Sequence, residues 1–306
     1  MKTGSPFQTA SPHRYATVNG VRLHYVEYGK GPLIVLLHGF PECWYAWRYQ
    51  LPALAEAGYR VVAPDLRGYN LSDKPKGVAA YRLECLVGDV KALIQALGED
   101  SAVVVGHDWG GVIAWQLAMT DPQAINKLII LNAPHPQRYL EALKTPGQLL
   151  RSWYVLFFQL PWLPELLIRG FGFAGLRQRL LNEPVHADAF DETSVKVYQQ
   201  ALAHPGALTA ALNYYRAGFR SLLKGLRQPV LPIEIPTLVI WGEQDRYLGM
   251  DLLEGLEPWV KDLTVERIAD ASHWVQSEVP ERVNERMLQF LRPPRAKSGL
   301  ASSMNG

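Results

Sequence analysis

Short apolar runs alternate with segments of helical spacing along most of the 306-residue chain. Continuous apolar runs of this length are typical of strands that are buried on both faces of a sheet. They predict strands at 32–37, 59–63, 101–105, 127–131, 237–241 and 263–268. Helical spacing falls between them, at 44–57, 81–97, 112–119 and 280–291. Because strands that alternate with helices build a mostly parallel sheet covered on both faces, the pattern predicts an α/β fold.

Two segments depart from this rhythm. Residues 15–28 alternate between apolar and polar around Asn19-Gly20, which predicts a β-hairpin with a tight turn. Residues 134–232 are rich in leucine and aromatic residues at helical spacing, with no buried strand, which predicts a helical insertion over the sheet. We therefore expect a core of 1–133 and 233–292, a helical cap of 134–232, and a disordered tail of 293–306.

The composition narrows the class of protein without defining it. The chain is 48% hydrophobic and 20% charged, with a net charge of +2, which is too small to indicate nucleic acid or an anionic membrane as a partner. Cys43 and Cys85 fit no metal spacing and make no disulfide framework. The first residues lack the apolar core of a secretory signal. These features predict a cytoplasmic, soluble protein, either a monomer or a homodimer.

The most apolar window of the chain is 152–168. It is interrupted by Pro161 and Pro164 and carries Gln159 and Glu165, so it makes a poor membrane span. We expect it to be a buried helix of the cap. Contact with a second copy or with a membrane surface is the alternative.

The hexapeptide Gly106-His-Asp-Trp-Gly-Gly111 stands between the strand 101–105 and the helix 112–119. A strand, a Gly-x-nucleophile-x-Gly turn and a helix form the nucleophile elbow of α/β-hydrolases. The elbow lifts one side chain, here Asp108, above the carboxyl ends of the strands, where the helix N-terminus favours negative charge. A plain helix N-cap is the alternative role for this aspartate.

Three further features follow strands in the order expected for this fold. Asp245 comes just after the strand 237–241, and His273 just after the strand 263–268. The order nucleophile, acid, histidine is that of an α/β-hydrolase triad. The segment His38-Gly-Phe-Pro41 follows the strand 32–37, where the fold draws an N–H group for its oxyanion hole. Together these features predict a catalytic triad of Asp108, Asp245 and His273.

An aspartate nucleophile restricts the substrate. When a carboxylate attacks an sp³ carbon, the carbonyl of the new ester belongs to the enzyme, and water can then attack that carbonyl beside the oxyanion hole. Attack on an ordinary ester would instead give an anhydride, which is a poor route. The substrate is therefore expected to be an alkylating electrophile, either an epoxide or an organohalide.

These motifs and several others resemble the epoxide hydrolases of the α/β-hydrolase superfamily. The similarity covers about residues 15–291 and rests on segments 38–50, 65–73, 106–111, 131–136, 212–216, 241–245 and 272–274. Asn70 is a departure, since many relatives have glycine there. The resemblance implies an α/β-hydrolase fold with an inserted cap, and hydrolysis of an epoxide to a vicinal diol.

The resemblance also implies two cap tyrosines that donate hydrogen bonds to the epoxide oxygen. Tyr154 stands before a Phe-Gln pair, and Tyr215 lies in the segment Asn213-Tyr-Tyr-Arg216. Opening an epoxide leaves an alkoxide, and tyrosine, with a pKa of about 10, still holds a proton to give at neutral pH. Because neighbours on a helix point about 100° apart, only one of Tyr214 and Tyr215 can face the pocket. Core packing is the alternative role for each tyrosine.

The remaining expectations concern the surroundings of the triad. The backbone N–H groups of Phe40 and Trp109 are expected to hold the oxyanion, and no metal or organic cofactor is required. The pocket walls are expected to be apolar, which indicates an apolar or aromatic epoxide as substrate, with water as co-substrate. The predicted wall residues are Phe40, Pro41, Trp109, Trp153, Phe157 and Trp274. His107 and His135 lie near the site in sequence and are expected to be structural.

Two other classes of function stay open. Dehalogenases share the elbow and the histidine motif. The fluoroacetate enzymes place Arg after the nucleophile and a His-Trp pair in the cap, where this chain has Trp109 and Trp153-Tyr154. Haloalkane dehalogenases carry a halide-binding Trp after the nucleophile but lack the tyrosine pair. The third class, a non-catalytic ligand-binding α/β-hydrolase, is disfavoured because all three triad positions are filled.

Overall fold

The computed structural model describes residues 13–223 and 231–292. Within them a single sheet has the strand order β1-β2-β4-β3-β5-β6-β7-β8. Its strands are β1 His13–Val18, β2 Val21–Tyr28, β3 Leu33–Leu37, β4 Arg60–Pro64, β5 Ala102–His107, β6 Ile125–Leu131, β7 Thr237–Gly242 and β8 Leu263–Ile268. Strand β2 pairs antiparallel with β1 and β4, and all other pairs are parallel. The predicted α/β fold is confirmed.

The predicted hairpin is formed by β1 and β2. Asn19 and Gly20 connect the two strands, and both have positive φ, 50° and 75°. A two-residue hairpin turn of this kind needs positive φ at both positions, which asparagine and glycine tolerate best. The same tolerance accounts for Asn70, which has a φ of 39°, a conformation that asparagine adopts more readily than most residues.

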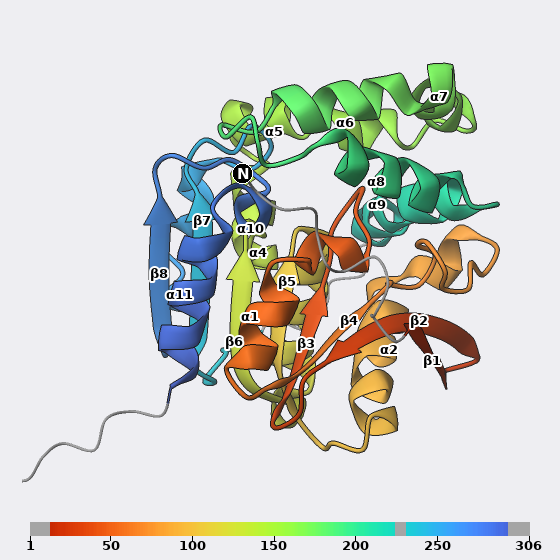
Figure 1. The fold of residues 1–306 in the computed structure, drawn as a ribbon. Helices are drawn as coiled ribbons and strands as arrows, with labels where there is room; N and C mark the ends of the chain where they lie inside the picture. The colour runs from red at the N-terminus through yellow and green to blue at the C-terminus, as the bar shows by residue number, and fades with distance from the viewer. Residues whose placement is uncertain (1–12, 224–230, 293–306) are drawn as a thin grey trace, which may run out of the picture.

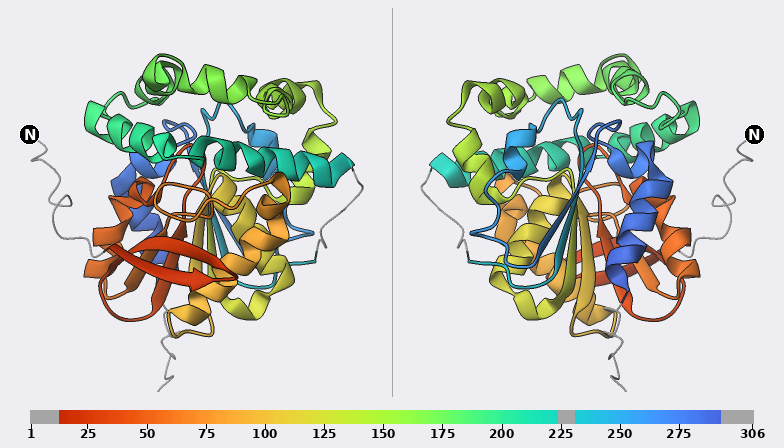
Figure 2. Two further views of the ribbon diagram at one scale, coloured as in Figure 1. Left: turned by 90° about the vertical axis from the view of Figure 1, so that its right-hand side faces the viewer. Right: turned by 90° about the vertical axis from the view of Figure 1, so that its left-hand side faces the viewer.

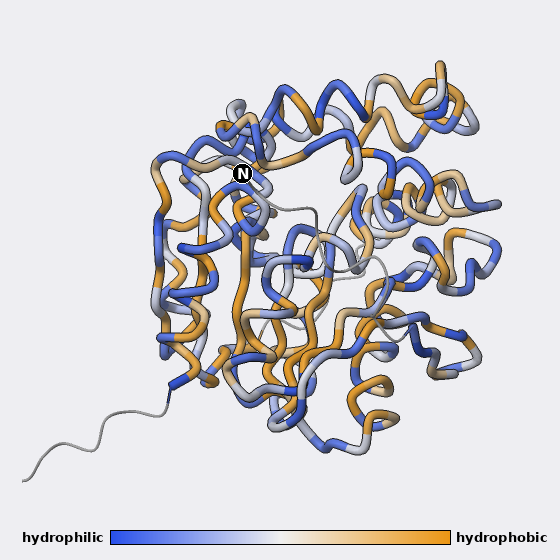
Figure 3. Tube along the Cα trace, viewed as in Figure 1, coloured by the Kyte–Doolittle hydropathy of each residue, from blue (hydrophilic) through white to orange (hydrophobic). Residues whose placement is uncertain are grey.

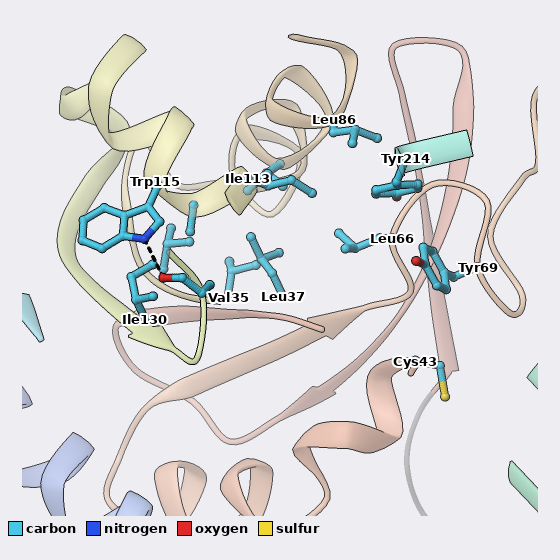
Figure 4. Packing of buried hydrophobic residues seen from close by; sticks show 14 of the residues in the cluster. Val35, Leu37, Cys43, Leu66, Tyr69, Leu86, Ile113, Trp115, Ile130 and Tyr214 are labelled. Carbon is cyan, nitrogen blue, oxygen red and sulfur yellow. Dashed lines mark hydrogen bonds between the residues drawn. The ribbon is translucent and has the colours of Figure 1, made fainter. Parts of the chain in front are cut away.

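Helices cover both faces of the sheet (Figure 2). Helices α1 Gln50–Glu56 and α11 Pro280–Leu291 pack on one face, and α2 Leu83–Ala96 and α3 Trp109–Thr120 on the other. Strand β3 shows why the apolar runs are continuous. Its Ile34 and Leu36 join the cluster under α1 and α11, whereas Val35 and Leu37 pack with Ile113 and Trp115 of α3 (Figure 4). A strand between two helical layers therefore needs apolar side chains at every position.

Two helix predictions are corrected. The segment 44–57 is not one helix but a 3₁₀ turn, η2 Trp44–Trp47, followed by α1. Pro52 falls in the first turn of α1, where a missing N–H removes no helical hydrogen bond. Helix α3 begins at Trp109 rather than 112, directly behind Asp108. The remaining short helices are η3 Val78–Tyr81, η4 Pro122–Ala124, η5 Met250–Leu253 and α10 Val275–Glu278.

Among the described residues between β6 and β7 there are six helices: α4 Pro136–Ala142, α5 Pro146–Arg151, α6 Trp153–Phe157, α7 Leu163–Asn182, α8 Glu192–Ala203 and α9 Ala207–Leu223. Helices α5 to α9 lie over the carboxyl ends of the parallel strands (Figure 1). Helix α7 is interrupted by non-helical residues from Gly170 to Phe173. These helices form the predicted insertion.

The expectation of a buried helix at 152–168 is wrong. Helix α6 ends at Phe157 and α7 begins at Leu163, because Pro161 and Pro164 cannot continue a helix. Helix α6 has no fully buried residue, and the first turns of α7 bury little beyond Pro164. Six large side chains of the window are exposed: Trp153, Leu156, Leu160, Trp162, Leu166 and Leu167. Across the described ranges, none of the helices has the length and apolarity needed to cross a membrane. The predicted tail, 293–306, lies outside the described residues.

Candidate active site

The elbow places Asp108 between β5 and α3 with a φ of 49°. Its two flanking glycines are required by close approach of the backbone. A Cβ on Gly106 would lie 2.4 Å from the carbonyl oxygen of Gly110, and a Cβ on Gly110 would lie 2.1 Å from that of Leu37. The Asp108 side chain makes no hydrogen bond that caps α3. Asp108 is thus the N-cap residue of α3 by position, but its carboxylate does not cap the helix.

The Asp108 carboxylate lies between the loop after β3 and the loop after β8. Its Oδ1 accepts a hydrogen bond of 2.8 Å from the backbone N–H of Phe40, and its Oδ2 lies 3.8 Å from Nε2 of His273. A Cβ on Gly39 would lie 2.4 Å from Cβ of Asp108, so only glycine lets this loop come so close. The two carboxylate oxygens therefore have different surroundings, one held by an N–H group and one beside an imidazole.

His273 is oriented by Asp245. Its Nδ1 lies 2.7 Å from Oδ2 of Asp245, which also accepts a hydrogen bond of 2.8 Å from Asn132. The other oxygen, Oδ1, accepts from the backbone N–H groups of Tyr247 and Leu248. Both oxygens of this buried carboxylate are thus occupied, and the imidazole presents Nε2 toward Asp108. The three predicted triad residues come together from the loops after β5, β7 and β8.

The electrostatic surroundings favour the imidazolium form of His273. Burial by itself would lower its pKa, but the charge and hydrogen bond of Asp245, with the charges of Asp108 and Glu42, raise the pKa to about 9. Burial also opposes ionisation of Asp245, yet His273, Asn132 and the backbone N–H of Tyr247 hold the pKa of this carboxyl below its usual value. The pair is therefore an imidazolium and a carboxylate at neutral pH while Asp108 is charged.

His107 connects Glu42 to the backbone of His273. Its Nδ1 lies 2.9 Å from Glu42, and its Nε2 lies 2.9 Å from the carbonyl oxygen of His273. Burial works against the charge of Glu42, but His107 keeps the pKa of that carboxyl lowered. His107 thus holds the backbone of His273. The sequence analysis did not single out Glu42, although it lies in the quoted segment 38–50.

His135 has a different position. It is buried, with its ring between those of Trp115 and Trp259. Neither ring nitrogen has a hydrogen-bond partner among the described residues, and burial lowers its pKa to about 4. This neutral imidazole packs in the core and is not among the residues that line the cavity at Asp108.

A cavity of about 320 Å³ lies over Asp108 and His273 and under the cap. Five of the six predicted wall residues line it: Phe40, Pro41, Trp153, Phe157 and Trp274. Trp109 is the exception. Its ring packs edge-on against Tyr214 and Tyr215, with centroids 5.5 and 5.1 Å apart, and its tip approaches Gly218 of α9. The Trp109 side chain thus fills space beneath α9 instead of lining the cavity. Further lining residues that the sequence analysis missed are Phe158, Leu167, Ile168, Gly175, Leu176, Arg179, Leu202 and Tyr247.

Tyr154 of α6 and Tyr215 of α9 both line the cavity. Their ring centroids are 5.8 Å apart. Tyr214 points the other way and donates a hydrogen bond of 2.7 Å to the carbonyl oxygen of Arg67, as the helical spacing requires. Burial raises the pKa of Tyr154 and of Tyr215 well above the usual value, and the charge of Asp108 adds to both shifts. Both hydroxyl groups therefore keep their protons at neutral pH.

Arg216 joins the two segments that carry these tyrosines. Its guanidinium donates to the carbonyl oxygens of Phe158 and Leu160 and pairs with Glu165, with nitrogen to oxygen distances of 2.7 to 3.0 Å. It thereby ties the end of α6 and the start of α7 to α9. Arg216 thus positions the two segments that carry Tyr154 and Tyr215. Its place in the sequence alone did not show this role.

The chain is similar to known proteins over most of its length. Residues 32–280 match the model of the family described as alpha/beta hydrolase fold, so the chain belongs to that family. Among curated relatives, the AB hydrolase superfamily protein YfhM of Bacillus subtilis is 42% identical, covering 91% of this chain and 97% of the relative. Epoxide hydrolase 4 of Homo sapiens is 39% identical, covering 92% and 79%. A crystal structure of the Bacillus megaterium epoxide hydrolase with an inhibitor has a TM-score of 0.84 and 35% identity, covering 91% of this chain and 99% of that one.

Proposed function

We propose that this protein is an epoxide hydrolase that converts an apolar or aromatic epoxide and water into a vicinal diol, through a covalent ester on Asp108. One observation carries the proposal. Two protonated tyrosines, Tyr154 and Tyr215, line the same cavity as Asp108 and the His273–Asp245 pair. The relatives named epoxide hydrolases support the same activity.

The first step is attack on an epoxide carbon by Oδ2 of Asp108. The Oδ1 atom is held by the N–H of Phe40, so it becomes the carbonyl oxygen of the ester. As the C–O bond of the epoxide breaks, Tyr154 and Tyr215 donate hydrogen bonds to the leaving oxygen, and one of them delivers a proton. The product of this step is a hydroxyalkyl ester of the enzyme.

The second step is hydrolysis of that ester. Once Asp108 is esterified, His273 gives up its resting proton, which restores the tyrosine that protonated the leaving oxygen. The neutral imidazole then takes a proton from water as the water oxygen attacks the carbonyl carbon of the esterified Asp108. The tetrahedral intermediate collapses as the bond between this carbon and the diol oxygen breaks, His273 returns the proton to the diol oxygen, and the new Asp108 carboxyl group passes its proton to the imidazole. Asp245 stabilises the imidazolium that forms. The backbone N–H of Phe40 already contacts the oxygen that becomes negative, and Trp109, as the first residue of α3, has a backbone N–H with no helical partner. We assign these two groups to the oxyanion hole.

The test is product analysis with styrene oxide, 1-bromobutane and fluoroacetate. Wild type is expected to give diol from the epoxide alone. Asp108→Ala is expected to lose at least about 10⁴-fold in rate, since it removes the covalent nucleophile. Asp100→Ala, which changes an exposed carboxylate far from the cavity, serves as the matched control and is expected to match wild type. Halide release without diol would identify a dehalogenase, and tight ligand binding without any turnover would identify a binding protein.

The pH dependence of ester hydrolysis follows from the shift at His273. Esterification removes the negative charge of Asp108, which is one of the charges that raise the pKa of His273. The pKa therefore falls below about 9 in the ester, and the imidazole becomes free to act as a base. We expect the single-turnover rate of ester hydrolysis to rise with pH and to level off below pH 9. Stopped-flow fluorescence measures this rate, and a rate that falls as pH increases would contradict the assignment.

A further inference from the structure

The cap carries a concentration of exposed apolar side chains. Nine of the large exposed hydrophobic residues fall in α5, α6, α7 and their connections: Leu149, Leu150, Trp153, Leu156, Leu160, Trp162, Leu166, Leu167 and Phe171. We call these nine residues the apolar cap face. Single exposed hydrophobic residues are normal on soluble proteins, whereas a concentration of them marks a surface that another apolar body covers.

Two aromatic residues stand out on this face. Phe171 is 100% exposed and Trp162 is 70% exposed. They flank the first part of α7, one just before Leu163 and one within the interruption after Gly170. Both residues have positive φ and lie outside regular helix. Their side chains face solvent. Exposed Trp and Phe beside leucines on a short helix are typical of segments that lie in the interface of a lipid bilayer.

The apolar cap face meets the cavity at two residues. Trp153 and Leu167 line the cavity and are also more than half exposed, so they lie where it reaches the surface. Phe157 and Ile168, from the same two helices, continue the apolar wall inward. A compound that enters the cavity at Trp153 and Leu167 thus passes beside residues of the apolar cap face. The cap helices mix hydrophobic and hydrophilic residues, whereas the strands of the sheet are more uniformly hydrophobic (Figure 3).

Basic side chains border the apolar cap face. Arg151, Arg179 and Arg246 line a second hollow that shares Trp153 with the cavity, and Arg169 lies on α7 itself. Two carboxylates lie nearby. Glu165 pairs with Arg216, and Glu183 accepts from the hydroxyl of Tyr247 and lies 3.8 Å from Arg179, so Arg179 already has a partner. In the parts of the chain that the structure describes, no ion pair is recorded for Arg169 or Arg246. The net charge of +2 averages over the chain and does not reveal this local excess.

We propose that the apolar cap face docks on the surface of a membrane that contains anionic lipids, with the cavity opening toward the bilayer. Trp162, Phe171 and the leucines enter the interface, and the arginines contact lipid phosphates. A second copy of the chain fits less well. A two-fold interface would bring together two copies of this arginine-bordered face, and the nearby carboxylates Glu165 and Glu183 are already paired within each copy. Delivery of an apolar epoxide from the lipid to Asp108 rests on the proposed function, whereas docking itself does not.

The experiment is co-sedimentation of the full chain with vesicles of phosphatidylcholine, with and without phosphatidylglycerol, at low and high salt. We expect binding to the anionic vesicles that weakens with salt. The double variant Trp162→Ser, Phe171→Ser is expected to bind about tenfold more weakly or worse, because the apolar area that enters the interface is lost. Replacing Arg169 and Arg246 by Gln is expected to cost about fivefold for each arginine.

Two control variants make the same kinds of substitution at exposed residues outside the apolar cap face. Leu71→Ser with Val265→Ser alters exposed hydrophobic residues outside the cap, and Lys30→Gln with Lys261→Gln removes charges near the amino ends of the strands. These controls are expected to bind like wild type, and all variants are expected to turn over a water-soluble epoxide at the wild-type rate without vesicles.

Equal binding by the cap variants, or no binding of wild type to any vesicle, would overturn the proposal. A solution dimer that the cap variants dissociate would overturn it too and would assign the face to a second copy. Vesicle binding is measured without substrate, so its outcome does not depend on the proposed function.

Discussion

The His273→Ala variant is expected to form the ester on Asp108 and then to stop. Alkylation requires the Asp108 carboxylate, the N–H of Phe40 and the two tyrosines, none of which is changed. Hydrolysis requires a base beside the ester carbonyl, and Nε2 of His273 is the group 3.8 Å from the Asp108 carboxylate. Loss of one general base slows a step by about 10²–10⁴-fold, so the ester should accumulate before it breaks down.

Intact-protein mass spectrometry after mixing with excess styrene oxide measures the expected outcome. The variant should gain the mass of one substrate molecule on nearly every chain, and a peptide containing Asp108 should carry it. Asp108→Ala with His273→Ala is the control that removes the site of attachment and should stay unmodified. His204→Ala replaces a histidine that does not line the cavity and should turn over normally. Rapid multiple turnover by His273→Ala would show that another group is the base.

The proximity of Asp108, Asp245 and His273 could be predicted from the sequence because each of the three motifs is local. Gly106, Asp108 and Gly110 occupy one turn, and the backbone contacts that demand the two glycines lie within that turn and the neighbouring β3. Asp245 and His273 each directly follow an apolar strand, so the parallel sheet alone brings them to the same edge. A prediction of this kind needs only strand order and the rule that carboxyl ends of parallel strands share one side.

The supporting contacts could not be predicted in the same way, because they join residues far apart in the chain. Asn132 and Asp245 come from loops after different strands, and Glu42 reaches His107 across the sheet. The direction of the Trp109 ring depends on the space beside Gly218, which helical periodicity does not encode. These contacts depend on the packing of side chains from separate elements.

The cap was the least predictable part for a related reason. Apolar residues at helical spacing predict a helix, but they do not say which element covers it. Between α6 and α7 the prolines divide the segment, and no described element packs over Trp162 or Phe171, which remain exposed. Burial is decided by neighbours in space. The apolar window 152–168 therefore had three open explanations, and the structure rules out only the buried helix.

The double variant Tyr154→Phe with Tyr215→Phe is expected to lose nearly all epoxide opening while it keeps its fold. Each substitution removes only a hydroxyl from a ring that stays packed against its aromatic neighbours. Without either donor, the leaving oxygen would depart as a free alkoxide inside an apolar cavity, where an uncompensated charge is strongly disfavoured. The loss should exceed the roughly 10²–10⁴-fold that one general acid contributes.

The two single variants separate the tyrosines from each other. Both hydroxyl groups are assigned to the same oxygen, so in each single variant the remaining donor compensates in part. Expressed as free energy of activation for ring opening, the effect of each single variant should be smaller than half of the effect of the double variant. Single-turnover rates of ester formation give these values directly. Tyr214→Phe is the matched control, because it removes a neighbouring hydroxyl that bonds the backbone of Arg67 outside the cavity. It should lower stability by about 1 kcal/mol and leave the rate of ring opening unchanged.

A double variant that still opens styrene oxide at a rate near that of wild type would show that the tyrosines only pack. The second step of the same enzyme provides a further comparison, since hydrolysis of the ester is assigned to His273 and not to the tyrosines. The double variant should hydrolyse any ester that it forms at the wild-type rate. A loss confined to ring opening would therefore separate proton donation from a general disturbance of the cavity, because both steps require the same Asp108 carboxyl group and the same N–H of Phe40.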